Sequence, residues 1–328
     1  MSVRVALVGL GEIGVNAHLP ALLAHPEVEL VALADPAPAR RQHVASLTRV
    51  PTVEGLDDVL AMAGVAVVLA TPPWVTPELS VRALRAGRHV LAEKPVATST
   101  EAAAVYDGLT AAERDRLQIG LTYRHDPALE QLREWLTDGV LGHPLLVRAH
   151  IYDERRDPGD PEHERRLRDT LRHGTPVVHE GAHVLDWLSY LLGGPPAAVA
   201  DAWALRTDDE FAAPNLTGAR LSYSDGTVAL VEFGWLTEAL PRCEISVLGP
   251  NGHVLLDGFT FTLALTTRDG KKVVDLPGDR TTRSFERQLT RFVDLVTGRG
   301  GRPAPGLADG LAALALSERI AHAAVGSA

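Results

Sequence analysis

Residues 9–14 read Gly9-Leu10-Gly11-Glu12-Ile13-Gly14, a GxGxxG pattern that follows an apolar run, residues 3–9, and opens a helical pattern, residues 12–24. In this context the first glycine permits a tight turn, and the second lets the backbone approach a pyrophosphate. The third lets helix and strand pack closely, with the anion at the N-terminus of the helix. The stretch therefore predicts a dinucleotide-binding unit in which Gly9, Gly11, Glu12, Ile13 and Gly14 contact the ligand.

An acidic residue, Asp35, ends the second apolar run, residues 28–34. A carboxylate at this place can accept both ribose hydroxyls of a dinucleotide. Its charge would repel a 2′-phosphate, so Asp35 favours NAD over NADP. Arg40 and Arg41 follow closely and leave NADP open, although the pattern favours a solvated helix face for both.

The first 121 residues alternate short apolar runs with helical patterns. Because the runs are apolar on both faces, they predict parallel strands that helices cover on each side, which is a doubly wound α/β fold. The predicted strands are residues 3–9, 28–34, 65–70, 89–92 and 118–121, and the predicted helices are residues 12–24, 37–47, 57–62, 77–86 and 100–114.

The pattern changes after residue 121, which predicts a Rossmann domain at 1–121 and a second α+β domain at 122–328. Asp-Gly and Asn-Gly pairs at 225–226, 251–252 and 269–270 separate apolar runs, as in hairpins of an antiparallel sheet. The charged stretch 154–173 holds six arginines and six acids, which favours a solvated loop or lid. The other predicted elements are a strand at 144–153 and helices at 127–137, 177–192, 282–297 and 308–324.

Composition excludes several classes of protein. The 328 residues are 45% hydrophobic and 23% charged, which is typical of a globular protein rather than a disordered one. Acidic residues outnumber Lys plus Arg by 42 to 32, and the net charge of −10 argues against nucleic acid and anionic membranes as partners. No apolar run has the ~18 residues of a membrane helix, and the N-terminal run fits a strand better than a signal peptide. The one cysteine, Cys243, cannot form an internal disulfide and indicates a reducing cytoplasm.

Lysine is rare in this chain, and one of its three lysines stands in a motif. Lys94 follows a predicted parallel strand in Ala92-Glu93-Lys94-Pro95, at the edge where open α/β sheets bind ligands. The other two, Lys271 and Lys272, follow a hairpin turn and look solvated. An ammonium is a compact donor whose pKa can shift, whereas a guanidinium stays charged, so Lys94 indicates chemistry that arginine cannot perform.

Five motifs in this order resemble the glucose–fructose oxidoreductase/inositol dehydrogenase/rhizopine catabolism (Gfo/Idh/MocA) family over the whole chain. They are the GxGxxG of residues 9–14, Asp35, Ala70-Thr71-Pro72-Pro73, residues 86–95 ending in Glu93-Lys94-Pro95, and Gly181-Ala182-His183-Val184-Leu185-Asp186. The resemblance implies an N-terminal Rossmann domain and a C-terminal domain with a large, mostly antiparallel sheet. That sheet often forms the oligomer interface, so a homodimer or homotetramer is expected.

The resemblance also implies roles for individual residues. Lys94 would hydrogen-bond the reacting oxygen beside the nicotinamide, and His183 would be the general acid/base. Thr71, Pro72 and Glu93 would line the cofactor. Two further residues, Tyr123 and Arg124, occupy the place of substrate-cleft residues.

The family pattern has an acidic residue four positions before the histidine, and this chain has His179 there. On one predicted helix His179, His183, Asp186 and Tyr190 share a polar stripe, which requires partners in a cleft or in a buried network. His179-Glu180-Gly181-Ala182-His183 also spells the HExxH of zinc proteases. A protease would leave the GxGxxG unexplained, and no third ligand stands out, so no metal is expected. His179, His183 and Asp186 could still form a three-ligand site.

The resulting prediction is an NAD-dependent oxidoreductase, with NADP left open, that exchanges a hydride with a secondary carbon of a sugar or cyclitol. Lys94, His183, His179 and Asp186 are its expected catalytic residues. The alternatives are a redox-assisted glycosidase that recycles its NAD, and a non-enzymatic regulator that senses sugar or NAD. The presence of both Lys94 and His183 argues against a regulator.

Overall fold

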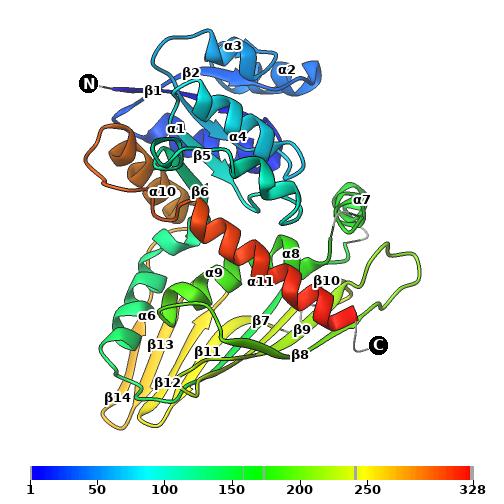
Figure 1. Cartoon of the computed structure of the whole chain (residues 1–328), viewed down its shortest axis with the longest axis vertical. Helices are drawn as coiled ribbons and strands as arrows, with labels where there is room; N and C mark the ends of the chain where they lie inside the picture. Colours follow the sequence, from blue (N-terminus) through cyan, green and yellow to red (C-terminus); the bar gives the residue numbers. More distant parts are fainter. Residues whose placement is uncertain (1, 158, 173, 240–241, 326–328) are drawn as a thin grey trace. The chain divides into compact units, whose positions relative to one another are not determined.

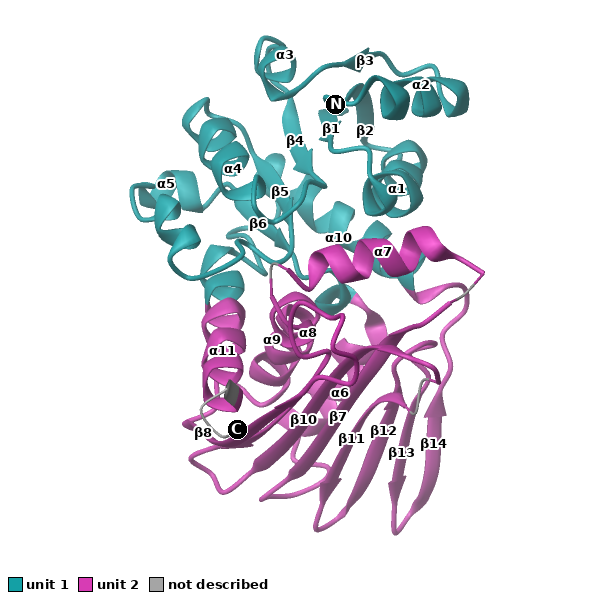
Figure 2. Ribbon diagram, turned by 90° about the vertical axis from the view of Figure 1, so that its right-hand side faces the viewer, with its two compact units in different colours: residues 1–125, 281–311 teal, residues 126–280, 312–328 magenta. Residues whose placement is uncertain are grey.

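The structure is a computed structural model that describes residues 2–157, 159–172, 174–239 and 242–325. Its contacts divide the chain into two compact units, coloured separately in Figure 2. Unit 1 comprises Met1–His125 and Thr281–Leu311, and unit 2 comprises Asp126–Arg280 and Ala312–Ala328. The predicted division into domains at residue 121 stays a prediction.

Unit 1 is built on sheet A, whose six described strands are all parallel and run in the order β3-β2-β1-β4-β5-β6. This order is that of a Rossmann fold, so the predicted doubly wound sheet is confirmed. The short strand β3 was not predicted. The strands are β1 (Val3–Val8), β2 (Val28–Ala34), β3 (Thr52–Val53), β4 (Ala66–Leu69), β5 (Val90–Glu93) and β6 (Leu117–Gly120).

Helices cover sheet A because its strands are apolar on both faces. Phe285, Leu289 and Phe292 of α10 join Leu7 of β1 and Leu33 of β2 in one buried cluster. The helical segments of unit 1 are η1 (Gly14–His18), α1 (Leu19–Ala24), α2 (Pro38–Leu47), α3 (Leu56–Leu60), α4 (Thr76–Arg85), η2 (Ala102–Tyr106), α5 (Ala111–Arg114), η3 (Thr122–His125) and α10 (Arg280–Val296), whose first residue belongs to unit 2. The helix α11 (Leu307–Val325) begins in unit 1.

The prediction of one helix over residues 100–114 is wrong. The segment forms the 3₁₀ turn η2 and the separate short helix α5. Thr110 caps α5, because its side chain accepts a hydrogen bond from Glu113 N–H while the Glu113 carboxylate accepts one from Thr110 N–H. This capping box starts a new helix after Gly108, which explains the break.

Unit 2 is built on sheet B, whose described strands run in the order β14-β13-β12-β11-β7-β10-β9-β8 (Figure 1). All neighbouring pairs are antiparallel except β7 and β10, and the three predicted hairpin turns connect β9 to β10, β11 to β12 and β13 to β14. The strands are β7 (Leu146–Arg155), β8 (Ala198–Leu205), β9 (Leu216–Ser222), β10 (Val228–Thr237), β11 (Cys243–Gly249), β12 (Gly252–Asp257), β13 (Leu263–Thr267) and β14 (Gly270–Val274).

The helices of unit 2 gather on one face of sheet B in both ribbon views (Figures 1 and 2). They are α6 (Pro127–Thr137), α7 (Pro161–Thr170), α8 (Pro176–His179), α9 (Gly181–Leu191) and the second part of α11. The predicted helix over residues 177–192 is therefore interrupted at Glu180. Among the described residues, no helix is long and apolar enough to cross a membrane.

The charged stretch 154–173 was predicted to be a solvated loop or lid. The prediction of a loop is wrong for Pro161–Thr170, which form helix α7. Asp160 caps helix α7 by accepting a hydrogen bond from His163 N–H, with Pro161 in the first turn. Leu167 and Leu171 are buried in one cluster with Phe211, Trp235 and Leu236. Residues 161–170 of the stretch thus form a packed helix of unit 2, residues 154–155 end β7, and positions 158 and 173 lie outside the described residues. The action of the stretch as a lid stays a prediction.

Candidate active site

The glycine loop after β1 has the geometry that each of its glycines predicts. Gly9 has a φ of +97°, and a Cβ there would lie 2.3 Å from the Ala70 carbonyl oxygen. A Cβ on Gly14 would lie 2.2 Å from the Gly9 carbonyl oxygen, so helix and turn are in close contact. By contrast, a Cβ on Gly11 would meet nothing within 4 Å. The loop therefore leaves open space at its middle glycine, which suits the close approach of a pyrophosphate.

Asp35 is almost completely buried, with 1% of its surface exposed. Its carboxylate accepts hydrogen bonds from the backbone N–H groups of Leu10 (2.9 Å) and Ala37 (2.8 Å). The half-exposed Arg40 guanidinium lies 3.4 Å from the same carboxylate, and Arg41 donates to the Asp35 carbonyl oxygen. Both arginines therefore lie beside Asp35, where the sequence predicts that the adenosine ribose binds.

The remaining predicted residues of unit 1 lie at the carboxyl ends of parallel strands, which meet at one edge of sheet A. Thr71 and the exposed Pro72 follow β4, and the two threonine hydroxyls of Thr71 and Thr76 are 2.7 Å apart. Glu93 ends β5 and Lys94 follows it, with a cis peptide bond before Pro95. Unit 1 thus brings the glycine loop, Thr71 and Lys94 to one sheet edge.

Tyr123 and Arg124 lie in η3, which follows β6 at the same edge of sheet A. The Arg124 guanidinium donates to the Asp309 carboxylate at 3.0 Å, and its side chain is mostly buried. This salt bridge fixes the arginine in place. Arg124, one of the two predicted substrate residues, is therefore held within unit 1.

Glu93 was expected to line the cofactor, and its carboxylate is buried inside unit 1. One oxygen lies 2.8 Å from Nε2 of His18, and the other accepts the backbone N–H of Lys94 at 3.1 Å. The His18 ring in turn packs edge-on against Phe285, with centroids 4.8 Å apart. No sequence motif singled out His18, because its partner lies 75 residues away.

In unit 2 the polar stripe predicted on a single helix spans two helices. His179 ends α8, whereas His183 and Asp186 belong to α9. The break is a tightened turn, because His183 N–H donates to the Glu180 carbonyl oxygen at 3.0 Å. All three side chains are buried, at 6%, 4% and 2% exposure respectively.

Aromatic rings pack against both histidines. His179 stacks on Trp235 at a centroid distance of 5.7 Å, and the Trp235 indole N–H donates to Asp153 at 3.1 Å. His183 stacks on Trp187 at 6.0 Å. These contacts restrain the orientation of both imidazole rings. A residue that transfers a proton in a fixed direction needs such a restraint.

The metal alternative receives no geometric support. Among the residues that the structure describes, no group of three or more His, Cys, Asp and Glu side chains could hold a metal ion. His179, His183 and Asp186 are therefore not gathered as a three-ligand centre.

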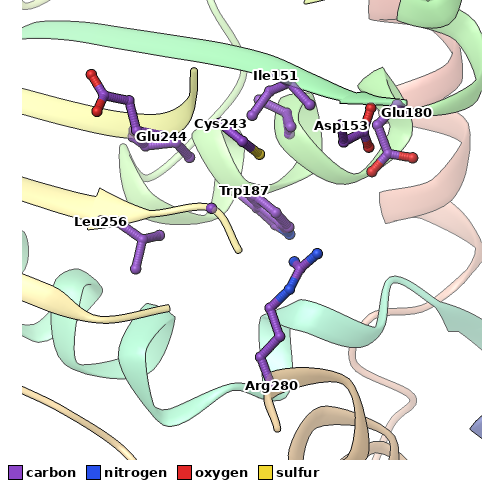
Figure 3. A pocket seen from close by; sticks show the side chains of 11 residues that line it. Ile151, Asp153, Glu180, Trp187, Cys243, Glu244, Leu256 and Arg280 are labelled. Carbon is purple, nitrogen blue, oxygen red and sulfur yellow. The ribbon is translucent and has the colours of Figure 1, made fainter. Parts of the chain in front are cut away.

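A small cavity of about 20 Å³, room for about one water molecule, lies within unit 2 beside α9. Trp187 forms part of its wall, and the guanidinium of Arg280 points toward that indole (Figure 3). The lining residues are Ile151, Asp153, Glu180, Val184, Trp187, Cys243, Glu244, Ile245, Leu256, Gly258 and Arg280. Carboxylates, a guanidinium and an aromatic ring thus meet on the face of sheet B that carries α9.

The thiol of Cys243, which lines this cavity, is unreactive. Burial, helped by the nearby Asp153 carboxylate and opposed by Arg280, raises the pKa of Cys243 from 9.0 to about 12. The thiol is therefore protonated at neutral pH and is no nucleophile. Asp153, Glu180, Trp187 and Arg280 were not predicted as site residues, because only the folding of sheet B brings them together.

The residues of unit 1 fit a dinucleotide. Open space at Gly11, the positive φ of Gly9 and the carboxylate of Asp35 at the end of β2 are the features that such a ligand needs. In addition, Trp74 is half exposed in the segment after β4, where the sequence had singled out only Thr71 and Pro72.

Two family models match the chain. Residues 3–121 match the oxidoreductase family with an NAD-binding Rossmann fold, and residues 129–255 match the GFO/IDH/MocA C-terminal domain. Inositol 2-dehydrogenase of Rhizobium meliloti (strain 1021) is 27% identical, and the match covers 97% of this chain and 96% of that protein. The dTDP-3,4-didehydro-2,6-dideoxy-alpha-D-glucose 3-reductase of Streptomyces antibioticus is 29% identical, with 97% and 95% covered.

Solved structures share the fold. An oxidoreductase from Agrobacterium radiobacter, in complex with NAD+, L-tartaric acid and magnesium, matches with a TM-score of 0.84 and 19% identity, and covers 100% of this chain and 98% of that one. A 3-ketoreductase from Actinomadura kijaniata, in complex with NADP and TDP-benzene, has a TM-score of 0.80 and 24% identity, with 98% of both chains covered. The chain therefore belongs to the Gfo/Idh/MocA family of NAD-binding oxidoreductases, as its motifs predicted.

Proposed function

We propose that this protein exchanges a hydride between a nicotinamide dinucleotide and a secondary alcohol or ketone carbon of a sugar or cyclitol. The observation that carries the proposal is the edge of sheet A, where an open glycine loop and Lys94 follow parallel strands of one unit. The buried His183 of unit 2 supplies the group that can accept a proton. Membership in a family whose named relatives act on cyclitols and sugar nucleotides supports the substrate class.

Each residue has a distinct task in this proposal. The bound dinucleotide supplies the carbon that accepts or donates the hydride. Lys94 donates a hydrogen bond to the reacting oxygen and stabilises the negative charge that develops on it. In the oxidation direction His183 accepts the hydroxyl proton as the carbon–hydrogen bond breaks, and in reduction it returns that proton. His179 and Asp186 are assigned to orienting His183 and tuning its proton affinity.

The loop residues hold the dinucleotide. Gly9, Gly11, Glu12, Ile13 and Gly14 bind the pyrophosphate region, and Thr71, Pro72, Glu93 and Lys94 border the nicotinamide half. Asp35 favours NAD, because its carboxylate would repel a 2′-phosphate. The nearby Arg40, 3.4 Å from that carboxylate, keeps NADP as a second cofactor.

The substrate is proposed to contact Tyr123 and Arg124 of η3, the residues that the family resemblance places in the substrate cleft. The phenol of Tyr123 and the guanidinium of Arg124 can hydrogen-bond the hydroxyl groups of a polyhydroxylated ring.

We also assign the protein to the cytoplasm as a homodimer or homotetramer. The outer face of sheet B supports an assembly, because it exposes apolar side chains on several neighbouring strands. These are Trp203, Leu205, Leu230, Leu248, Leu255 and Val273. Sedimentation of the purified chain tests this, and a monomer at micromolar concentration would contradict it.

A screen of sugars, inositols and their oxidised forms, with NAD and NADP, tests the catalytic proposal. Formation of one NADH per molecule of substrate is the expected result, and the Lys94→Met variant should bind NAD but lack turnover. A glycosidase that recycles its NAD would instead release product without net NADH. Tight NAD or sugar binding without any turnover would indicate a regulator and would overturn the proposal.

A further inference from the structure

We propose that His18 and Glu93 form a positioning pair that holds Lys94 in register with the dinucleotide loop. The proposal rests on the function proposed above, in which Lys94 polarises the reacting oxygen. His18 is assigned no contact with substrate or cofactor. Glu93 borders the cofactor in that proposal, but both of its carboxylate oxygens are bonded within unit 1, so the pair is inferred to act by positioning Lys94.

The first support is the set of hydrogen bonds around the Glu93 carboxylate. Its two oxygens have different partners: Nε2 of His18 at 2.8 Å and the backbone N–H of Lys94 at 3.1 Å. The second bond orients the peptide unit that leads into Lys94. Because one oxygen of the Glu93 carboxylate is bonded to His18, the carboxylate cannot rotate without breaking the bond to His18. The His18 ring thereby controls the orientation of the Lys94 backbone.

The second support is where the pair lies. His18 is the last residue of η1, the π-helical segment that begins at Gly14, the last glycine of the GxGxxG loop. Glu93 is the last residue of β5. The pair therefore links the segment that would hold the pyrophosphate to the segment that carries Lys94. Such a link fixes the amine relative to the cofactor, and a displacement of about 1 Å in a reacting group can lower a rate by a hundredfold.

The third support is how firmly the pair is enclosed. His18 and Glu93 are 4% and 7% exposed. The Phe285 ring of α10 packs edge-on against the imidazole. A Cβ on Gly120 of β6 would lie 3.0 Å from the Glu93 carboxylate, so glycine leaves the space that this side chain fills. The net contribution of one such hydrogen bond to stability is modest, which favours a role in geometry over one in stability.

The test uses His18→Phe, which keeps a ring against Phe285 but removes the donor to Glu93, and His18→Gln, which restores an N–H donor. Arg116→Met is the matched control, because it removes a hydrogen bond to the Leu84 carbonyl oxygen at the other end of β6. Each variant is assayed for thermal unfolding, for kcat and for KM of NAD.

A readout that does not need turnover is available because the chain has three lysines, at positions 94, 271 and 272. An amine-reactive ester is added to the NAD-saturated protein, and mass spectrometry follows acylation at each lysine. Lys271 and Lys272, which lie in β14 of unit 2, serve as internal standards.

The expected result for His18→Phe is a fall in kcat of about tenfold to a hundredfold, with KM for NAD changed less than about threefold. Acylation of Lys94 should accelerate by about threefold or more, because a loosened backbone releases the amine more often. His18→Gln should restore most of both values, and Arg116→Met should lower only the unfolding temperature.

A folded His18→Phe protein with wild-type kcat and wild-type acylation of Lys94 would overturn the proposal and leave the pair as packing. If His18→Phe does not fold, Glu93→Gln, which keeps an acceptor for Lys94 N–H but removes the charge, is judged by the same two results. Turnover by Lys94→Met would refute the proposed function, whereas the acylation rates would still report on the pair.

Discussion

The carboxylate of Asp35 accepts a hydrogen bond from the backbone N–H of Leu10 at 2.9 Å, so the end of β2 is bonded directly to the glycine loop after β1. The residue that would recognise the ribose thereby also holds the loop that would bind the pyrophosphate. Its carboxylate is buried, and the half-exposed Arg40 guanidinium lies 3.4 Å from it. Cofactor preference and loop geometry are therefore coupled through one side chain.

Asp35→Ser should raise kcat/KM for NADP relative to NAD by about tenfold, because it removes a charge that faces the 2′-phosphate and leaves Arg40 to bind it. Total activity with NAD should fall, because serine is too short to keep the bond to Leu10. Initial rates with both cofactors measure the ratio. The control is Asp35→Ser combined with Arg40→Ala, which should lose the gain, and a wild type that already prefers NADP would contradict the assignment.

Lys94→Arg should fold normally and lose about a hundredfold in kcat. The guanidinium is planar and larger, and it stays charged, so it cannot take the place of an ammonium that polarises an oxygen. Affinity for NADH, measured by fluorescence, should change little. Lys271→Arg, on the exposed strand β14, is the control and should have wild-type kcat. Near-normal turnover in Lys94→Arg would reduce Lys94 to a structural contact.

Much of sheet A could be predicted because a strand buried on both faces is a short continuous apolar run, which loops and surface helices rarely imitate. The predicted run at residues 28–34 coincides with β2, and the GxGxxG stretch marks its own turn. Residues 100–114 could not be read in this way, because helical propensity extends across Gly108 while the capping box at Thr110 starts a new helix.

The stretch 154–173 shows a different limit. Its charges look solvated along the sequence, yet Arg168 pairs with Glu164 within α7 and lies over the Phe211 ring, 43 positions away in the chain. Asp160 followed by Pro161 is a helix start that could have been recognised locally. The contact between Arg168 and the Phe211 ring could not be recognised from the local sequence.

The same distinction between local and long-range signals applies to the candidate site. Residues inside motifs, such as Lys94 and His183, could be singled out, because the motif itself states the spacing. The buried partner His18 and the cavity residue Arg280 become visible only through long-range packing, because their contacts join distant segments.

Stability should decrease in weak acid because of His125. Burial, with the nearby Arg291, Arg124 and Arg287 guanidinium groups, lowers the pKa of this histidine from 6.5 to about 3. The folded state then binds fewer protons than the unfolded state between these two values, so stability falls as the pH drops below about 6.5. At pH 5 the loss is about 2 kcal/mol.

Urea unfolding at pH 7.5 and pH 5 measures this effect in the wild type and in His125→Gln, which should lose less stability. The exposed His43→Gln is the control and should behave as the wild type does. Equal losses in the wild type and in His125→Gln would assign the acid sensitivity to other groups.

The last prediction concerns His179, where this chain departs from its family pattern. His179 ends α8, four residues before His183 of α9, and its ring stacks on Trp235. Replacing it by Asp would place a negative charge near His183, which favours the imidazolium. The acid limb of the oxidation pH–rate profile should then move upward by about one pH unit, since the base accepts protons at higher pH.

His179→Asn has the size of Asp and no charge, so it should lose the same ring stacking without moving the limb. A shift of equal size in both variants would trace the effect to the lost packing on Trp235. An unmoved limb with unchanged kcat in His179→Asp would show that His179 is a packed core residue without coupling to the catalytic base.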